Sequence, residues 1–422
     1  MLDIKFIKEH PDLIKEAARK KHIDFDVAAL LALEEQRAAA QKHFESLRTE
    51  QHALSDEIPK TTDPEKRAAL LIDLKPRKEK VQAAEEAVKL VMKDWQALML
   101  QVPNIPDMSV PEGEDDRGNL EVKVWGEKPK FSYTPKDHIE LMEKLGMADF
   151  EKGASVAGFR GYFLKGDGAL LEFALHQFVI NHFNTTKKDY ELMIVPSLVR
   201  KQTLMGTGYL PGGEDDLYQT QDEDYLAGTA EVATMSYFAD VVLDPESLPL
   251  KKLAFSPAFR REAGSHSKDT KGLFRVHEFR KFEQVILCEA HHESSVKYHE
   301  ELLANAEEIL QALGLHYHVV VNCGGDLGLG QVKKYDIEVW VPSQQTFRET
   351  HSCSYFHDFQ TRRLNIRYKD ADGKLRYAHS LNNTALAMPR ILQHIVENFQ
   401  EADGRIRVPE VLKQYIGKDY LG

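Results

Sequence analysis

FSPAFRREAGSHSKDTKGLFRVHEFRKFE, residues 255–283, is the stretch that decides the fold. It predicts two strands joined by a loop that is rich in Gly, Ser, Lys and Arg and holds Lys268, Lys271 and Arg275. Arg260 and Glu262 lie two residues apart at the end of the first strand, so we expect both side chains on one face. Such an arginine can grip a phosphate, and the carboxylate can accept a hydrogen bond from an adenine amino group.

The returning strand adds Phe279 and, four residues later, Glu283, again on one face. Phe279 offers an aromatic surface for a base, and the basic loop suits a polyanion that passes above it. A hairpin with an ordinary charged surface explains Arg260, Glu262 and Glu283 equally well, so the spacing alone leaves both interpretations open.

Working outward, the rest of the C-terminal part predicts an α+β fold. Strands follow one another with few helices between them, which favours an antiparallel sheet over a doubly wound one. Helices are expected at 169–184 and 385–400. The expected strands are 190–195, 253–255, 276–287, 317–321, 335–341 and 365–367.

The first hundred residues follow a different pattern. Residues 28–102 contain no glycine, and apolar or small residues recur at alternating spacings of three and four on both sides of Pro59-Lys-Thr-Thr-Asp-Pro64. This predicts two long helices folded back as an antiparallel coiled coil, an arm of roughly 45 Å for about 30 residues. Two ordinary helices of a bundle are the alternative. Pro76 should kink the second helix or mark its first turn.

The expected organisation is an N-terminal domain at 1–103 with a helical hairpin arm at about 28–102. A linker rich in Pro, Asp and Gly follows at 104–118, and a catalytic domain spans 119–422.

Composition excludes several classes of protein. The 422 residues include 55 Lys and Arg against 67 Asp and Glu, a net charge of −12, so nucleic acid would have to meet a local basic patch. The three cysteines form no CxxC, the N-terminus has no uncharged apolar run, and no stretch is apolar enough to span a membrane. We therefore expect a reduced, cytoplasmic protein. The P-loop, GxGxxG and GxSxG patterns are absent.

The 255–283 stretch resembles motif 2 of the class II aminoacyl-tRNA synthetases. ELMIVPSLV, with Pro196, resembles motif 1, and LNNTALAMPRILQHIVENFQ, with Arg390, resembles motif 3. MGTGYLPGGEDDLYQT at 205–220, the GTAEV around Thr229 and the block KKYDIEVWVPSQQTFRETHSCSYFHDFQTRR from Lys333 resemble the bacterial-type seryl-tRNA synthetases. The resemblance covers essentially the whole chain.

This resemblance implies activation of L-serine with ATP and Mg²⁺, and transfer of serine to tRNA(Ser) and also to tRNA(Sec), by a homodimer. Arg260 would hold the α-phosphate and Arg390 the γ-phosphate, and Glu349 and Ser352 would hold Mg²⁺. Glu262 would read the adenine amino group and Phe279 would stack on the base. The remaining implied ATP-binding residues are Arg261, Val276, Thr350 and His351. The implied serine-binding residues are Thr229, Ala230, Glu231, Arg260, Glu283 and Thr384.

The arm would contact tRNA, and its basic cluster is Lys75, Arg77, Lys78 and Lys80; a solvated helix face explains that cluster equally well. The chain departs from the family pattern at Ala227-Gly228 and Ala233 around the Thr-Ala-Glu triplet, and at Asn383, Thr384, Ala385 and Pro389 in motif 3. Thr384 keeps a hydroxyl, whereas Ala385 and Pro389 replace glycines.

Two rival functions are weaker. A ligase that loads a carrier protein would lack the arm at 28–102. A non-catalytic relative would have lost the charged positions that Arg260, Glu349 and Arg390 fill. The enzymatic interpretation requires Arg260 and Arg390 to converge on one nucleotide.

Overall fold

The computed structural model describes residues 1–264, 269 and 271–422, so the loop lysine Lys268 lies outside the described residues. The chain divides into two compact units. One consists of Asp3–Arg19 and Ile23–Pro103, and the other of Met1–Leu2, Lys20–His22 and Asn104–Gly422. Among the described helices, none is long and apolar enough to cross a bilayer.

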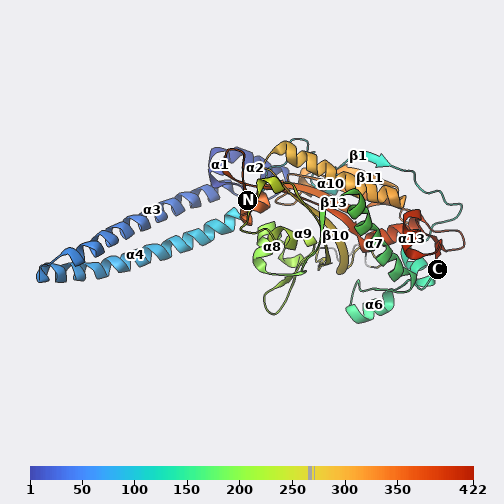
Figure 1. Ribbon diagram of the computed structural model, residues 1–422, viewed down its shortest axis with the longest axis horizontal. Helices are drawn as coiled ribbons and strands as arrows, with labels where there is room; N and C mark the ends of the chain where they lie inside the picture. Colours follow the sequence, from blue (N-terminus) through green and yellow to red (C-terminus); the bar gives the residue numbers. More distant parts are fainter. Residues whose placement is uncertain (265–268, 270) are drawn as a thin grey trace. The chain divides into compact units, whose positions relative to one another are not determined.

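The smaller unit is dominated by two long helices that run side by side in opposite directions (Figure 1). They are α3, Val27–Glu57, and α4, Pro64–Met99, joined by a 3₁₀ turn at Ile58–Lys60. Asp26 caps α3 by accepting from the Ala29 amide at 3.0 Å, and Asp63 caps α4 with Pro64 in its first turn. Two shorter helices, α1 (Ile4–Glu9) and α2 (Pro11–Lys20), precede them.

Polar residues that interrupt the apolar stripe of the arm have specific partners. The Arg37 guanidinium lies 5.2 Å from the centre of the Trp95 ring and donates to Glu34 at 2.7 Å, so it bridges α3 and α4. Pro76 lies inside α4, so the expectation that it marks a first turn was wrong. Its ring removes one helical hydrogen bond at Ile72, which is 76% exposed, so water can reach the released carbonyl.

The larger unit is built on an eight-stranded sheet with the order β1-β11-β12-β13-β16-β10-β9-β4. Every neighbouring pair is antiparallel except β4 with β9. This confirms the α+β class. The bounds are β1 Leu120–Trp125, β4 Tyr190–Ile194, β9 Leu250–Phe259, β10 Glu278–Cys288, β11 Tyr317–Val321, β12 Lys333–Val341, β13 Thr346–His357 and β16 His379–Ala387.

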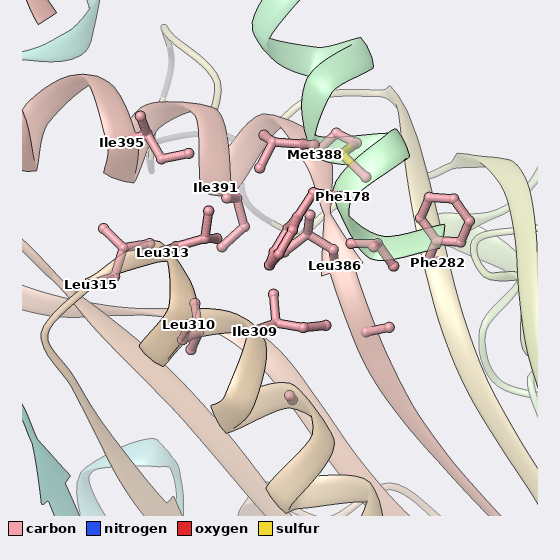
Figure 2. Close-up of a cluster of buried hydrophobic side chains, with 14 of the residues drawn as sticks. Phe178, Phe282, Ile309, Leu310, Leu313, Leu315, Leu386, Met388, Ile391 and Ile395 are labelled. Carbon is pink, nitrogen blue, oxygen red and sulfur yellow. The ribbon is translucent and has the colours of Figure 1, made fainter. Parts of the chain in front are cut away.

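Three helices pack on this sheet: α7 (Asp167–Thr186), α10 (His292–Leu313) and α12 (Met388–Asn398). Figure 2 shows their side chains meeting those of the sheet in one core. Leu310 of α10 and Ile391 of α12 are fully buried there, next to Leu386 of β16. This packing fixes the position of α12, and therefore of Arg390 in its first turn, relative to β16.

The expected helix at 385–400 began too early. Residues 385–387 complete the buried strand β16, and the helix starts at Met388 because Pro389 suits a first turn. The strand expected at 365–367 begins only at Arg367, as β14, and belongs to a small separate sheet with β8 and β15.

The remaining elements are short. The helices are α5 His138–Lys144, α6 Phe150–Ala157, α8 Lys201–Thr207, α9 Ala230–Ser236, α11 Phe359–Arg363 and α13 Lys413–Ile416. The strands are β2 Ala148–Asp149, β3 Phe163–Leu164, β5 Leu198–Val199, β6 Tyr218–Gln219, β7 Tyr225–Leu226, β8 Val242–Leu243, β14 Arg367–Lys369, β15 Leu375–Tyr377, β17 Ile406–Arg407 and β18 Tyr420–Leu421.

Candidate active site

Arg390, in the first turn of α12, forms an ion pair with Glu349 of β13. Arg390 Nη1 lies 3.3 Å from Glu349 Oε1 and donates to the Glu349 carbonyl at 2.9 Å. Burial by itself would raise the pKa of Glu349, but the charges of Arg390, Lys334 and Arg260 outweigh it and the pKa lies below its usual value. The charges of Arg260, Lys334 and Arg390 thus all lower the pKa of this one carboxyl group.

Arg260 is held in place from two sides. Its amide donates to the His277 carbonyl at 3.0 Å, directly after β9 ends, and its Nε donates to the Gly228 carbonyl at 3.3 Å. Its guanidinium carbon lies 5.4 Å from the centre of the Phe279 ring. An aromatic face and a cation thus lie side by side, as a purine nucleotide would need.

Glu262 does not share a strand face with Arg260, so that expectation was wrong. β9 ends at Phe259, and Glu262 has φ +56°, a left-handed conformation in which strand alternation no longer applies. Its carboxylate forms an ion pair with Arg275 instead.

Phe274 is a member of the site that the sequence analysis missed. Its ring lies between two guanidinium groups, with the carbon of Arg348 at 3.8 Å and that of Arg390 at 4.5 Å. Its carbonyl accepts from Arg390 Nε at 3.3 Å. Arg348 also donates to Asp269 at 2.5 Å. The end of the motif 2 loop is therefore tied to the γ-phosphate candidate Arg390.

A second group of residues, which we call the acidic pocket, brings together buried carboxylates and hydroxyl groups. Thr229 caps helix α9 by accepting from the Glu231 amide at 3.3 Å, and its hydroxyl donates to Glu283 Oε2 at 3.2 Å. Glu283 lies opposite Thr384 in the β10–β16 ladder. Thr229, Ala230, Glu231, Glu283 and Thr384 are all buried. The five implied serine-binding positions other than Arg260 thus lie in adjoining elements.

Lys281 is the second residue that the sequence analysis missed. It is 5% exposed and forms an ion pair with Glu283, which is 3% exposed. The two residues are separated by one position on β10, so they share a face. That i, i+2 charge pair inside an apolar strand was the available signal.

Glu231 is buried but well supplied with donors. Tyr209 Oη donates to its Oε2 at 2.9 Å, and Gln360 Nε2 donates to its Oε1 at 2.6 Å. Burial raises the pKa of Glu231, and the Gln360 and Tyr209 hydrogen bonds oppose this rise.

The other implied ATP positions differ in exposure. Arg261 is exposed and Ser352 is half-buried, whereas Val276 is 4% exposed. Thr350 donates to the Ile337 carbonyl at 3.1 Å, and His351 Nε2 lies 3.1 Å from the Ala385 carbonyl. Burial lowers the pKa of His351 to about 4, so its ring is neutral at pH 7. The side chains of Thr350 and His351 thus bond to protein atoms rather than face a ligand.

The basic cluster lies on α4. Lys75, Lys78 and Lys80 are exposed, whereas Arg77 forms ion pairs with Glu50 at 3.3 Å and Asp73 at 3.0 Å. The three lysines are therefore better placed than Arg77 to meet a polyanion.

Comparison with known proteins gives a consistent result. Residues 1–106 match the model of the seryl-tRNA synthetase N-terminal domain, and residues 215–399 match the tRNA synthetase class II core domain (G, H, P, S and T). A serine–tRNA ligase of Deinococcus radiodurans is 47% identical over 424 residues, covering 100% of this chain and 99% of the relative. The chain belongs to the seryl-tRNA synthetase family.

Solved structures of this family have the same fold. The seryl-tRNA synthetase of Pyrococcus horikoshii complexed with ATP has a TM-score of 0.89 at 36% identity, covering 100% of this chain and 99% of that one. The cytoplasmic serine–tRNA ligase of Naegleria fowleri in complex with AMP has a TM-score of 0.86 at 32% identity, with coverages of 100% and 98%. This chain is therefore a class II aminoacyl-tRNA synthetase, a serine–tRNA ligase with an N-terminal helical arm.

The departures in motif 3 fit this seryl-tRNA synthetase fold locally. Ala385 occupies the extra position of a β-bulge between β16 and β10, and Pro389 lies in the first turn of α12. Neither position has a left-handed φ, so neither needs glycine.

Proposed function

We propose that this synthetase condenses L-serine with ATP to seryl-adenylate and then esterifies the terminal adenosine of tRNA(Ser). A serine carboxylate oxygen attacks the α-phosphorus, the bond to the bridging oxygen breaks, and pyrophosphate leaves. The ribose hydroxyl of the tRNA then attacks the seryl carbonyl, and AMP leaves. The placement of Arg260 between the Phe279 ring and the Gly228 carbonyl, next to Thr229, together with the ion pair of Arg390 with Glu349, carries this proposal.

The first step needs no side-chain nucleophile. Positioning of the two substrates and stabilisation of the charge on the phosphates can supply most of the rate. In our assignment Arg260 holds the α-phosphate and Arg390 the γ-phosphate, and Phe279 stacks on the adenine. Arg261 and the backbone near Glu262, Val276, Thr350 and His351 complete the ATP site.

The acidic pocket suits serine. Thr229 and Glu231, with the backbone of Ala230, would bind the ammonium group, and Glu283 with Thr384 would bind the hydroxyl. Alanine has no hydroxyl to bond with Glu283 and Thr384, so it would lose a hydrogen bond that serine makes to a buried charged group. The extra methyl group of threonine would be excluded by the buried walls.

Mg²⁺ fits the site as an ion that protein oxygens and the phosphate oxygens of ATP would bind together. Glu349 and Ser352 offer oxygen ligands, and the described residues contain no group of three or more metal-ligating His, Cys, Asp or Glu side chains. Mg²⁺ characteristically takes one or two protein ligands and fills the rest with phosphate oxygens and water. When bound, it would neutralise charge on the phosphates.

We assign residues 1–103 to tRNA binding, through Lys75, Arg77, Lys78 and Lys80 on the arm, and residues 119–422 to catalysis, with a linker at 104–118. The proposal includes tRNA(Sec) as a second acceptor and a cytoplasmic location. Charging of purified tRNA(Sec) with labelled serine tests the first, and cell fractionation tests the second.

We also propose a homodimer. The free edge of β4 carries Ile194, which is 83% exposed, and Phe173 of the neighbouring α7 is 69% exposed. Phe173 and Phe163 line one hollow with Tyr162 and His176. Exposed apolar side chains beside an unpaired strand edge are typical of an interface between copies. Light scattering should give twice the chain mass, and the mass of a single chain would contradict the dimer.

Serine-dependent exchange of pyrophosphate into ATP tests the function. We expect exchange with serine and far less with alanine or threonine; exchange with another amino acid but not serine would refute the assignment.

Arg260→Ala should abolish exchange, because the α-phosphate loses its cation, and it should leave the thermal unfolding midpoint nearly unchanged. Arg376→Ala is the matched control, since Arg376 pairs on the surface with Asp370 at 2.9 Å. Near-normal exchange by Arg260→Ala would remove Arg260 from its role.

A further inference from the structure

Behind the acidic pocket lies a chain of buried polar groups that ends at Ser380. Ser380 Oγ donates to Gln360 Oε1 at 2.7 Å, and Gln360 Nε2 donates to Glu231 Oε1 at 2.6 Å. Gln360 and Ser380 are 1% and 0% exposed. Gln360 lies on α11, which contacts both α8 and β16. The network therefore joins three elements behind Glu231.

The orientation of the Gln360 amide is fixed by its surroundings. Its Nε2 faces the Glu231 carboxylate and the Thr207 carbonyl at 3.2 Å; the carbonyl and the ionised carboxylate can only accept. The reversed amide would place its oxygen against both of them. Ser380, whose hydroxyl can donate, occupies the other side. The amide thus presents a donor to Glu231 in its only satisfied orientation.

From this geometry we propose that Gln360 is a positioning residue that keeps the Glu231 carboxylate ionised and aimed so that it binds the ammonium group of serine. This inference rests on the proposed function and names a residue for its amino acid specificity that does not touch the substrate. Tyr209 holds the other carboxylate oxygen at 2.9 Å, so both oxygens are fixed while the carboxylate stays available to a cation.

The energetic role of Gln360 follows from burial. Glu231 is 3% exposed. A buried carboxylate that has no hydrogen-bond donors takes up a proton, because burial disfavours its charged form. Burial is the largest cause that raises the pKa of Glu231, and the Gln360 hydrogen bond is the largest that lowers it. Glu283 adds to the rise, and Lys281 opposes it. Without Gln360, Glu231 should be protonated over a wider pH range and bind an ammonium group less well.

Gln360→Met tests this, because methionine keeps the length of the side chain and removes both polar atoms. In serine-dependent pyrophosphate exchange at pH 7 we expect the KM for serine to rise at least about tenfold, from one lost hydrogen bond to a charged group. The KM for ATP should change less than about twofold. The ratio of variant to wild-type KM for serine should fall as the pH is raised from 6.5 to 8.5, since higher pH ionises Glu231 again.

Gln393→Met is the matched control, because Gln393 is also fully buried and its amide atoms have no hydrogen-bond partner within the described residues. We expect the KM for serine to be unchanged in that variant. Tyr209→Phe provides a second test, which also serves if Gln360→Met fails to fold; it removes the other donor and should raise the KM for serine in the same pH-dependent way.

Two results would overturn the inference while leaving the proposed function intact: an unchanged KM for serine in Gln360→Met, or a rise that does not depend on pH. If Gln360→Met does not fold, an unchanged KM for serine in Tyr209→Phe overturns it likewise. A wild-type chain without serine-dependent exchange would instead refute the proposed function, and this inference with it.

Discussion

Lys281 and Glu283 place a complete ion pair in the interior of the sheet, beside a second carboxylate. Their side chains are 7% and 3% exposed, and Lys281 is the cation of the pair. Buried pairs of this kind add little net stability compared with apolar residues, but removal of one partner is costly because the other charge remains buried. Lys281 therefore gives Glu283 a partner of opposite charge in a pocket that already contains Glu231.

Lys281→Met should lower the free energy of unfolding by about 3–5 kcal/mol, the usual cost of a buried charge without its partner. The double variant Lys281→Met/Glu283→Gln should regain part of this loss, because the uncompensated charge is then absent. Denaturant unfolding of the full chain measures both. If the single and double variants lost the same free energy, the pair would not be the cause.

At the scale of elements, β1 forms one of the two edges of the eight-stranded sheet, and a histidine of the neighbouring strand helps to hold it there. His318 of β11 lies between Glu121 of β1 at 2.7 Å and Glu338 of β12 at 2.8 Å, and its ring stacks on Phe347 of β13 at 3.9 Å. Burial alone would lower the pKa of His318, but the hydrogen bonds to Glu338 and Glu121 outweigh it and the pKa is raised above 6.5. The protonated ring thus joins two carboxylates across three strands.

A raised pKa gives a definite sign to the pH dependence. The stabilisation by His318 is fully present below pH 6.5, the value for the unfolded chain, and is lost as the pH rises through the higher folded-state pKa. We expect amide hydrogen exchange in residues 120–125 to accelerate across this window beyond the intrinsic increase with pH. His318→Gln should remove that extra acceleration, and an identical pH profile in the variant would contradict the assignment.

Elements were easier to predict than their ends. The antiparallel sheet, the paired helices and β11 followed from periodicity and β-branched content, which are local properties. The face shared by Arg260 and Glu262 was predicted wrongly because β9 ends at Phe259, a boundary set by its pairing with β10. Gln360 was missed because its partners Glu231, Thr207 and Ser380 come from distant elements, whereas Lys281 could have been found from its spacing to Glu283. The site residues that were named came from the family resemblance, not from periodicity.

At the scale of the whole molecule, the chain forms two compact units, to which our proposal assigns catalysis and tRNA binding. The larger unit holds every residue that we assign to ATP and serine, and the smaller unit carries the exposed lysines of α4. Because the net charge of −12 repels tRNA in general, we expect a local group of lysines to have a large effect on binding. Removal of the arm should therefore affect only the step that uses tRNA.

Replacement of residues 28–100 by a short Gly-Ser linker should spare serine-dependent pyrophosphate exchange and abolish charging of tRNA(Ser).

In the full chain, Lys75→Ala/Lys78→Ala/Lys80→Ala should weaken tRNA binding and make it less dependent on salt. The slope of the logarithm of the binding constant against the logarithm of the salt concentration should become shallower by roughly 0.7 to 0.9 for each phosphate that is no longer neutralised. Lys297→Ala/Lys369→Ala/Lys374→Ala changes the net charge equally with exposed lysines of the larger unit and should leave the slope unchanged. If both triple variants weakened binding to the same extent, general charge rather than the arm would govern the encounter. Unchanged charging by the deletion variant would show that tRNA is held elsewhere.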